Sequence, residues 1–291
     1  MIIQRKALRQ HLGVNRLHTV TLGTAQLTVG VGSAVNVFDP AYGNTDYSGQ
    51  QLYQNAWIRA GSADYRVGSF NVGSGAWVSA QLVRGAAIPS GGDVEIWQKI
   101  SPSDADRYID EAILQLRVRR EVGILTASDA NFYAVDTAAS PHTIKAVLNA
   151  YVFGTPSGAT DRQRHDLTQE QIVTTATGTE IRLPHGLAGS QQLVLDAILQ
   201  LSLGASDTAT LNLGPLYDEE AILWGAAARV YDALMQDSPG QEFGNYEKLN
   251  LRAVKQSNRL VRKGMPQIDA KIGFDSPFEQ TRESGPLDDW R

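Results

Sequence analysis

Three acidic residues stand together at Asp218, Glu219 and Glu220, and paired carboxylates of this kind can serve as the general acid and base of a catalytic site. The three residues also open a stretch of helical periodicity, where negative charge is favoured by the positive end of the helix dipole. A solvated first helical turn explains their position without catalysis, and we favour that interpretation.

The histidines are the next candidates for chemistry: His11, His18, His142, His165 and His185. None of them stands at the HxH or HxxxH spacing of metal ligands. The chain has no cysteine, which excludes disulfides, thiolate metal sites and cysteine nucleophiles. The stretch "GTPSG" at 154–158 lacks the serine that a nucleophile elbow needs at its third position. We therefore expect no metal, no cofactor and no enzymatic activity.

Basic residues suggest a binding surface instead. Arg252, Lys255, Arg259 and Arg262 follow one another at intervals of three, four and three, which places them in one stripe on a helix. The net charge of −5 argues against nucleic-acid binding through overall charge, although it permits a local basic patch. The stripe is either a solvated face or a surface that faces an acidic partner or a phosphate backbone. A smaller cluster with the same two interpretations contains Arg117, Arg119 and Arg120.

The last part of the chain, residues 264–291, has no helical period and contains several prolines and glycines. It nevertheless carries large apolar residues at intervals: Ile268, Ile272, Phe274, Phe278 and Trp290. Disordered segments are usually poor in such residues. This composition predicts an extended C-terminal arm that docks along a partner, and the alternative is an arm that wraps its own chain.

The clearest helix lies in "SPSDADRYIDEAILQLRVRREVG", residues 101–123. Ser101 is suited to the N-cap, Pro102 to the first helical position and Asp104 to the first turn. Apolar residues then recur at intervals of three and four, which predicts an amphipathic helix over 101–119. The same pattern indicates further helices near 3–12, 218–236 and 244–263.

Short alternating runs rich in Val, Leu, Trp and Tyr fill the regions between these helices, and turn residues separate them. The chain is therefore predicted to have an α+β fold with a helical platform and two inserted antiparallel β-sandwich-like regions. The platform comprises residues 1–16, 100–124 and 214–263, the β regions are 17–99 and 125–213, and the arm follows.

The apolar face of a lone helix needs a partner, because most helix stability comes from tertiary packing. We expect Ile109, Ile113 and Leu116 to pack against the largest apolar residues of the 218–236 helix: Trp224, Tyr231 and Leu234. No window approaches 18 consecutive apolar residues, and the start "MIIQRKALRQHLG" lacks the apolar run of a signal peptide. We therefore expect no membrane span.

The layout resembles the head–tail adaptors, or connectors, of tailed phages and prophages. The resemblance rests on "RKALRQHLG", on "GGDVEIWQKISPSDADRYIDEAILQLR" and on "LGPLYDEEAILWGAAARVYDALM", in that order. It implies a structural virion protein that forms a dodecameric ring beneath the portal, with an arm that reaches the portal. The implied partners are the portal protein, neighbouring copies and a tail or stopper protein, with DNA passing transiently through the ring. The implied location is the virion neck, after assembly in the host cytoplasm.

Two other classes remain open: another tail or baseplate component, and a carbohydrate-binding module. In the second class, exposed Trp57, Trp77 and Trp97 would stack on sugars. All three lie in predicted strands, so we favour packing in a core.

Overall fold

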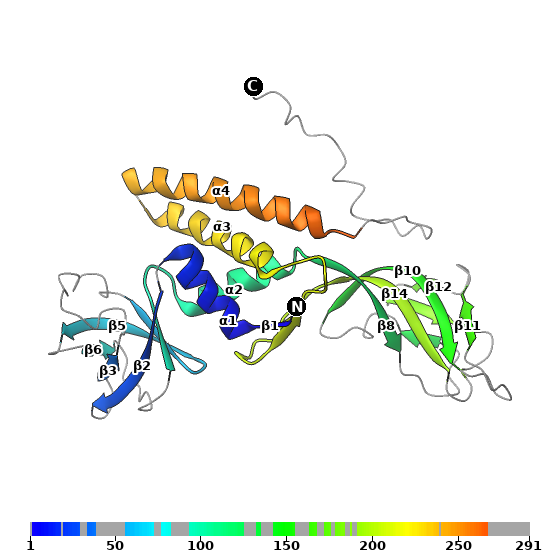
Figure 1. The fold of residues 1–291 in the computed structure, drawn as a ribbon, viewed down its shortest axis with the longest axis horizontal. Coiled ribbons are helices and arrows are strands. Elements are labelled where there is room, and N and C mark those ends of the chain that lie inside the picture. The colour runs from blue at the N-terminus through cyan, green and yellow to red at the C-terminus, as the bar shows by residue number, and fades with distance from the viewer. Residues whose placement is uncertain are drawn as a thin grey trace, which may run out of the picture. The chain divides into compact units, whose positions relative to one another are not determined.

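The protein has an α+β fold (Figure 1). The computed structural model describes residues 2–18, 20–29, 34–38, 56–72, 77–82, 93–124, 132–134, 142–154, 163–167, 172–175, 178–183, 187, 191–238 and 240–266. The chain divides into two compact units. The first comprises residues 1–116 and 203–264, and residues 117–202 belong to the second.

The helices all belong to the first unit: α1 (Arg5–His11), its continuation as the π-helix η1 (Leu12–Leu17), α2 (Pro102–Ile113), α3 (Glu219–Asp237) and α4 (Gln241–Gly264). The predicted helices near 218–236 and 244–263 are thus confirmed as α3 and α4, which lie side by side (Figure 1). None of the helices in the described ranges combines the length and the apolar composition that crossing a bilayer requires.

Helix α2 begins as predicted but ends earlier. The hydroxyl of Ser101 accepts a hydrogen bond from the backbone N–H of Asp104 at 3.0 Å, and Pro102 occupies the first helical position. The helix stops at Ile113 rather than at 119, because strand β8 (Arg117–Ile124) follows after a short turn. Strand β8 pairs along its whole length with β14 (Gln192–Gln200), so the sheet satisfies its backbone groups.

The shortened helix changes the predicted boundaries. Arg117, Arg119 and Arg120 lie on strand β8 of the second unit, and not at the end of a platform helix. Residues 117–124, which were expected in the platform, therefore belong to the second β unit.

The N-terminal segment also differs from the prediction. Residues Ile2–Gln4 form strand β1, so the helix expected from residue 3 begins at Arg5. Strand β1 pairs antiparallel with β15 (Thr210–Asn212). This pairing draws residues 203–213, which were expected in the second β region, into the first unit.

The first β region is a closed antiparallel barrel and not a sandwich. Its strands are β2 (Val20–Val29), β3 (Ala34–Phe38), β4 (Trp57–Ala60), β5 (Ala63–Val72), β6 (Trp77–Leu82) and β7 (Asp93–Trp97). They pair in the order β2-β3-β6-β5-β4-β7, and β7 pairs back with β2. Closure leaves no strand of this sheet with an unpaired edge, which is the edge that an open sheet exposes.

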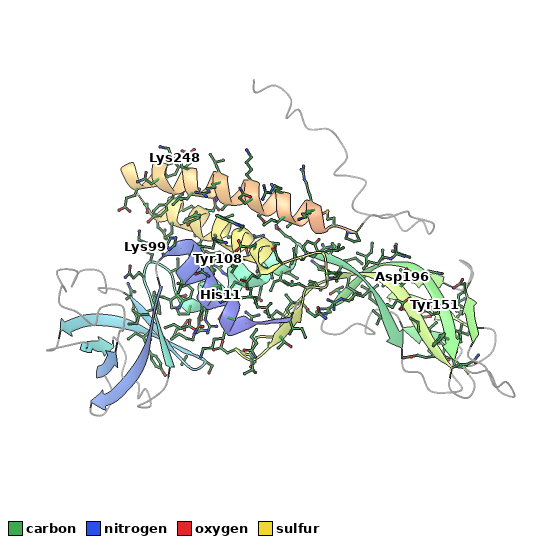
Figure 2. The ribbon with its side chains drawn as sticks, in the orientation of Figure 1. His11, Lys99, Tyr108, Tyr151, Asp196 and Lys248 are labelled. Atoms are coloured by element: carbon green, nitrogen blue, oxygen red, sulfur yellow. The ribbon has the colours of Figure 1, made fainter. Side chains whose placement is uncertain are left out.

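The second unit contains two antiparallel sheets. The larger has the order β11-β10-β14-β8, in which β10 spans Thr143–Gly154 and β11 spans Gln163–Asp166. The smaller has the order β12-β13-β9, formed by Ile172–Thr175, Gly178–Arg182 and Phe132–Ala134. Side-chain hydrogen bonds join strands of the larger sheet. The Tyr151 hydroxyl donates to Glu121, and Asp196 accepts from Arg119; Figure 2 labels Tyr151 and Asp196. Within the larger sheet, β14 lies between β10 and β8.

Helix α2 packs against α3, as expected for its apolar face. Ile109, Ile113 and Leu116 are fully buried. The backbones approach closely, since a Cβ atom at Gly225 of α3 would lie 3.0 Å from the Cβ of Ala112. The α3 residues expected in this contact line a cavity with residues from η1 and α4: Trp224, Tyr231 and Leu234.

Candidate partner-binding surface

Helix α4 packs against the first unit through one of its faces. Four residues at intervals of seven, four and four are buried on that face: Tyr246, Ala253, Ser257 and Val261. The side-chain amide of Asn250 donates to a backbone carbonyl of α3, that of Ala228, at 2.7 Å. The opposite face of α4 is left to solvent, and Figure 2 shows Lys248 on the side of the helix away from α3.

The outward face of α4 carries a shallow groove, which we call the α4 groove. Its lining residues are Leu251, Val254, Lys255, Asn258, Arg259 and Arg262. Leu251 is 63% exposed and Val254 is 39% exposed, which is unusual for aliphatic side chains on a packed helix. The groove therefore combines an exposed apolar seam with a flank of positive charge.

The four cations of the predicted stripe are exposed, in agreement with their spacing on one helix face. Within the described residues, none of them forms a salt bridge with a carboxylate. Arg252 stands apart from the other three, because its guanidinium lies 5.9 Å from the ring centroid of Trp224, within the range of a cation–π contact. The stripe thus divides into three residues on the α4 groove and one beside Trp224.

The residues predicted for the arm lie outside the described part of the chain: Ile268, Ile272, Phe274, Phe278 and Trp290. Their role as anchors stays a prediction.

Two of the acidic residues at the start of α3 are half-buried and contact basic side chains of α1 and η1. Glu219 lies 3.1 Å from Nδ1 of His11, and Glu220 pairs with Arg16. These contacts fasten α3 to α1 and η1. The described residues contain no group of histidines and carboxylates arranged to hold a metal ion.

Of the remaining histidines, His18 and His142 belong to no metal-binding group within the described residues. His142 accepts a hydrogen bond from the backbone N–H of Ser202 at 3.2 Å, and burial is the main cause that lowers the pKa of its imidazole. The side chains of His165 and His185 lie outside the described residues.

The three tryptophans considered for sugar binding differ in their surroundings. Trp97 is completely buried, and its indole N–H donates to Glu95 at 2.9 Å. Trp57 is half-buried with the guanidinium of Arg66 5.8 Å from its ring centroid, and the side chain of Trp77 lies outside the described part. Packing in the barrel core, the favoured interpretation, holds for Trp97.

A buried ionic network, which the sequence did not reveal, joins α1 to the barrel. Its members are Arg5, Arg9, Arg59, Asp64, Glu95, Asp106, Asp110 and Asp207. Arg9 is the centre, since its guanidinium donates to Glu95 of β7, Asp106 of α2 and Asp207 before β15. Arg59 of β4 reaches the same Asp106 at 2.8 Å. The network thus fixes three segments that are far apart in sequence.

The pKa values in the network follow from the balance of burial and pairing. Burial alone would lower the pKa of Arg9, but its hydrogen bonds to Asp207 and Glu95 outweigh that effect and raise it. For Asp207, burial would raise the pKa, and the hydrogen bond from Arg9 lowers it instead. For Asp110, burial prevails over the pairing with Arg5, and the pKa is raised.

Comparison of this chain with protein-family models, with curated proteins and with solved structures finds no match.

Proposed function

We propose that the protein is a head–tail adaptor, which assembles with further copies of itself into a ring between portal and tail and acts without catalysis. Support comes from the resemblance of residues 5–13, 91–117 and 213–235 to that family. The order of elements agrees with it, since a barrel separates α1 from α2 and a second β unit separates α2 from α3 and α4. In this proposal the ring belongs to the virion neck, assembles in the host cytoplasm and lets DNA pass.

The α4 groove is the observation that carries the proposal. Lys255, Arg259 and Arg262 have no carboxylate partner in the described ranges, and they border the exposed side chains of Leu251 and Val254. Apolar side chains supply most of the binding energy at an interface, while rim charges select and steer the partner. A surface of this kind suits an acidic protein face, such as one on a portal or on a neighbouring copy.

A charge-removal experiment tests this role. The triple variant Lys255→Gln, Arg259→Gln and Arg262→Gln is compared with a matched triple variant at exposed cations outside α4, Arg66→Gln, Arg107→Gln and Lys145→Gln. Both variants lose the same formal charge. Binding to the portal protein from the genome that encodes this chain is then measured by sedimentation at several salt concentrations.

We expect the α4 variant to bind the portal about tenfold more weakly, since three surface charge pairs together contribute about 1–2 kcal/mol. Its affinity should also depend less on salt than that of the unmodified chain. Equal portal binding by the two triple variants at physiological salt would mean that the stripe is only a solvated face.

The arm has a separate place in the proposal. Ordering a segment costs roughly 1–2 kcal/mol per residue, so residues 264–291 require many contacts to become fixed. We propose that these contacts come from the portal or an adjacent copy. Hydrogen exchange tests this directly: the amides of 267–291 should exchange fast in the isolated chain and slowly in the assembly. Protection already present in the isolated chain would contradict it.

A further inference from the structure

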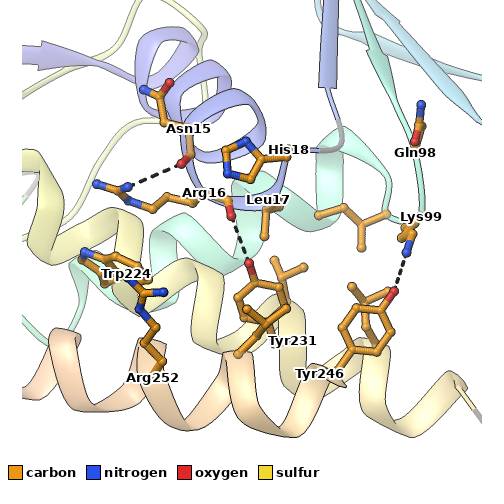
Figure 3. Close-up of a pocket in the computed structure, with 14 residues that line it drawn as sticks. Asn15, Arg16, Leu17, His18, Gln98, Lys99, Trp224, Tyr231, Tyr246 and Arg252 are labelled. Atoms are coloured by element: carbon orange, nitrogen blue, oxygen red, sulfur yellow. Dashed lines mark hydrogen bonds between the residues drawn. The ribbon is translucent and has the colours of Figure 1, made fainter. Parts of the chain in front are cut away.

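A cavity of about 400 Å³ lies among η1, the residues that precede α2, α3 and α4 (Figure 3). We call it the aromatic pocket. The residues that matter for its chemistry are Arg16, Lys99, Trp224, Tyr231, Tyr246 and Arg252. All of them belong to the first unit, and they come from four different segments of the chain.

Aromatic rings form one wall of this pocket. The guanidinium of Arg16 lies 4.6 Å from the ring centroid of Trp224, and that of Arg252 lies 5.9 Å from it. Tyr231 stacks on Tyr246, with ring centroids 6.4 Å apart and planes 24° from parallel. The Tyr231 hydroxyl donates to the backbone carbonyl of Arg16 at 2.9 Å, which fixes the ring. Such a wall suits a ligand with a flat or apolar body.

The pocket is lined by three permanently charged side chains, and all three are cationic. Arg16, Lys99 and Arg252 line it, and its lining includes no acidic residue. Glu220 partly neutralises Arg16, whereas Lys99 and Arg252 have no carboxylate partner within the described ranges. The Nε–H of Arg16 is buried and finds no acceptor among the described residues. These groups favour a ligand that brings negative charge next to its apolar part.

The backbone around the pocket is strained. Among the described residues, the two non-glycine residues with positive φ are His18, at 52°, and Lys99, at 70°. Both line the aromatic pocket. A non-glycine residue in this region carries a conformational cost that the surrounding structure must support, and such residues concentrate at ligand sites. The fold therefore maintains two costly conformations at the rim of one cavity.

We propose that the aromatic pocket receives the acidic–aromatic segment "LDDW", residues 287–290, of a neighbouring copy of this chain. This inference rests on the ring proposed above. Asp288 and Asp289 supply two adjacent carboxylates for Lys99 and Arg252, and Trp290 supplies a flat apolar body for the aromatic wall. The segment thus offers, in three consecutive residues, the chemistry that the pocket lacks.

Length and symmetry both allow the exchange. Asp288 is 22 residues beyond Pro266, a span of roughly 70 Å when extended. The distance along α4 from Gly264 back to Tyr246 is only about 27 Å, so the segment is longer than its own pocket requires and has length left to extend to another copy. A closed ring requires two different surfaces on each copy that fit each other head to tail. A cationic pocket and an acidic segment on the same chain are such a pair.

Disulfide trapping tests the inference on the full chain, because a protein without cysteine reports only the cysteines that are introduced. One chain carries Asn15→Cys at the exposed rim of the pocket, and a second carries Arg291→Cys beside the segment. The control replaces Asn15→Cys by Asn212→Cys, an exposed asparagine on β15 that lines neither the aromatic pocket nor the α4 groove. The two chains are mixed and oxidised, and the amount of mixed dimer is measured.

We expect about tenfold more mixed dimer with Asn15→Cys than with Asn212→Cys. Replacing Asp288 and Asp289 by Asn, or Arg252 by Gln, should reduce the dimer by a similar factor, since charge-assisted contacts are lost. Equal trapping at both asparagines, trapping insensitive to the Asp→Asn changes, or a bond formed only within one chain would each overturn the inference.

The outcome is separable from that of the proposed function. Trapping is measured without a portal, and portal binding is measured with unmodified chains. A specific mixed dimer in a chain that never binds a portal would support the pocket and refute the adaptor. Rings that bind the portal, in a chain that gives no specific mixed dimer, would support the adaptor and refute the pocket.

Discussion

Arg9 and Glu95 form a two-pronged ion pair inside the first unit: Nε of Arg9 donates to Oε2 of Glu95 at 2.9 Å, and Nη2 donates to Oε1 at 3.0 Å. Both side chains are essentially buried. Breaking a buried pair by removing one partner leaves the other charge without compensation, which is far more costly than losing an exposed pair. The pair therefore fastens α1 to the barrel, and the platform with its first insertion behaves as one unit.

Replacing Arg9 by methionine should lower the free energy of unfolding of the first unit by about 3–5 kcal/mol, because it leaves the buried carboxylate of Glu95 without its cation. The matched control is Arg107→Gln, which removes an exposed pair with Asp104 and should cost less than about 1 kcal/mol. Tryptophan fluorescence in urea is a suitable probe, since Trp57, Trp77, Trp97 and Trp224 all belong to this unit. Similar losses for the two variants would disprove the role of the network.

Asp207 makes this stability dependent on pH. Burial would raise its pKa, but Arg9 lowers it below the ordinary value of 3.8, so the folded state holds the ionised form more firmly than the unfolded state. Its contribution is therefore complete above about pH 4 and is lost as the pH falls through the lowered pKa. In Asp207→Asn, the urea concentration at the unfolding midpoint should fall less steeply as the pH decreases from 4 to the acid transition.

The pKa of Asp110 is shifted in the opposite direction, and this residue serves as the comparison. Burial raises its pKa, so the folded state binds its proton more readily and gains stability as the pH falls through that raised value. Asp110→Asn should remove this gain, so that the free energy of unfolding falls more steeply as the pH decreases. The same slope in both variants would contradict the assigned directions.

The contact of α2 with the rest of the first unit is tested by two neighbouring residues. Ile113 is fully buried, whereas Leu114 is 45% exposed. We expect Ile113→Ala to cost about 2–5 kcal/mol through lost burial and a residual cavity. Leu114→Ala should cost well under half of that, and equal costs would mean that the face of α2 is not packed as described.

Two helical glycines form another matched pair. A Cβ atom at Gly225 would lie 3.0 Å from Cβ of Ala112 and 3.2 Å from Oγ of Ser257, whereas one at Gly244 would meet nothing within 4 Å. Gly225→Ala should therefore destabilise the first unit by about 1–3 kcal/mol through overpacking. Gly244→Ala should stabilise it by about 0.5–1 kcal/mol through helix propensity. A midpoint of thermal unfolding that shifts in the same direction in both variants would contradict the close approach of α2, α3 and α4.

Local signals in the sequence predicted the helix starts well. The cap at Ser101 and the acidic first turn of α3 lie where composition placed them, because such signals depend only on neighbouring residues. The end of α2 could not be predicted in the same way. Apolar spacing continues through Leu116, and only the pairing of Arg117–Ile124 with a strand some 75 residues later overrides it.

The same limit applies to the candidate sites. The stripe on α4 was predictable because its spacing is local. The ionic network was not, since Arg9 and its partner Asp207 are separated by 198 residues and each resembles an ordinary surface charge in the sequence. The aromatic pocket was hidden for a similar reason: Lys99 and Tyr246 meet only after folding, 147 residues apart.

The central claim, that the chain is an adaptor that assembles into a ring on a portal, is tested most directly by mass. The purified 31.6 kDa chain is measured by native mass spectrometry alone and after mixing with the portal protein from the genome that encodes it. The account predicts that the chain mixed with the portal forms a complex that has gained one chain per portal subunit. A chain that stays at its own mass in the presence of assembled portal, at physiological salt and in excess, would contradict it.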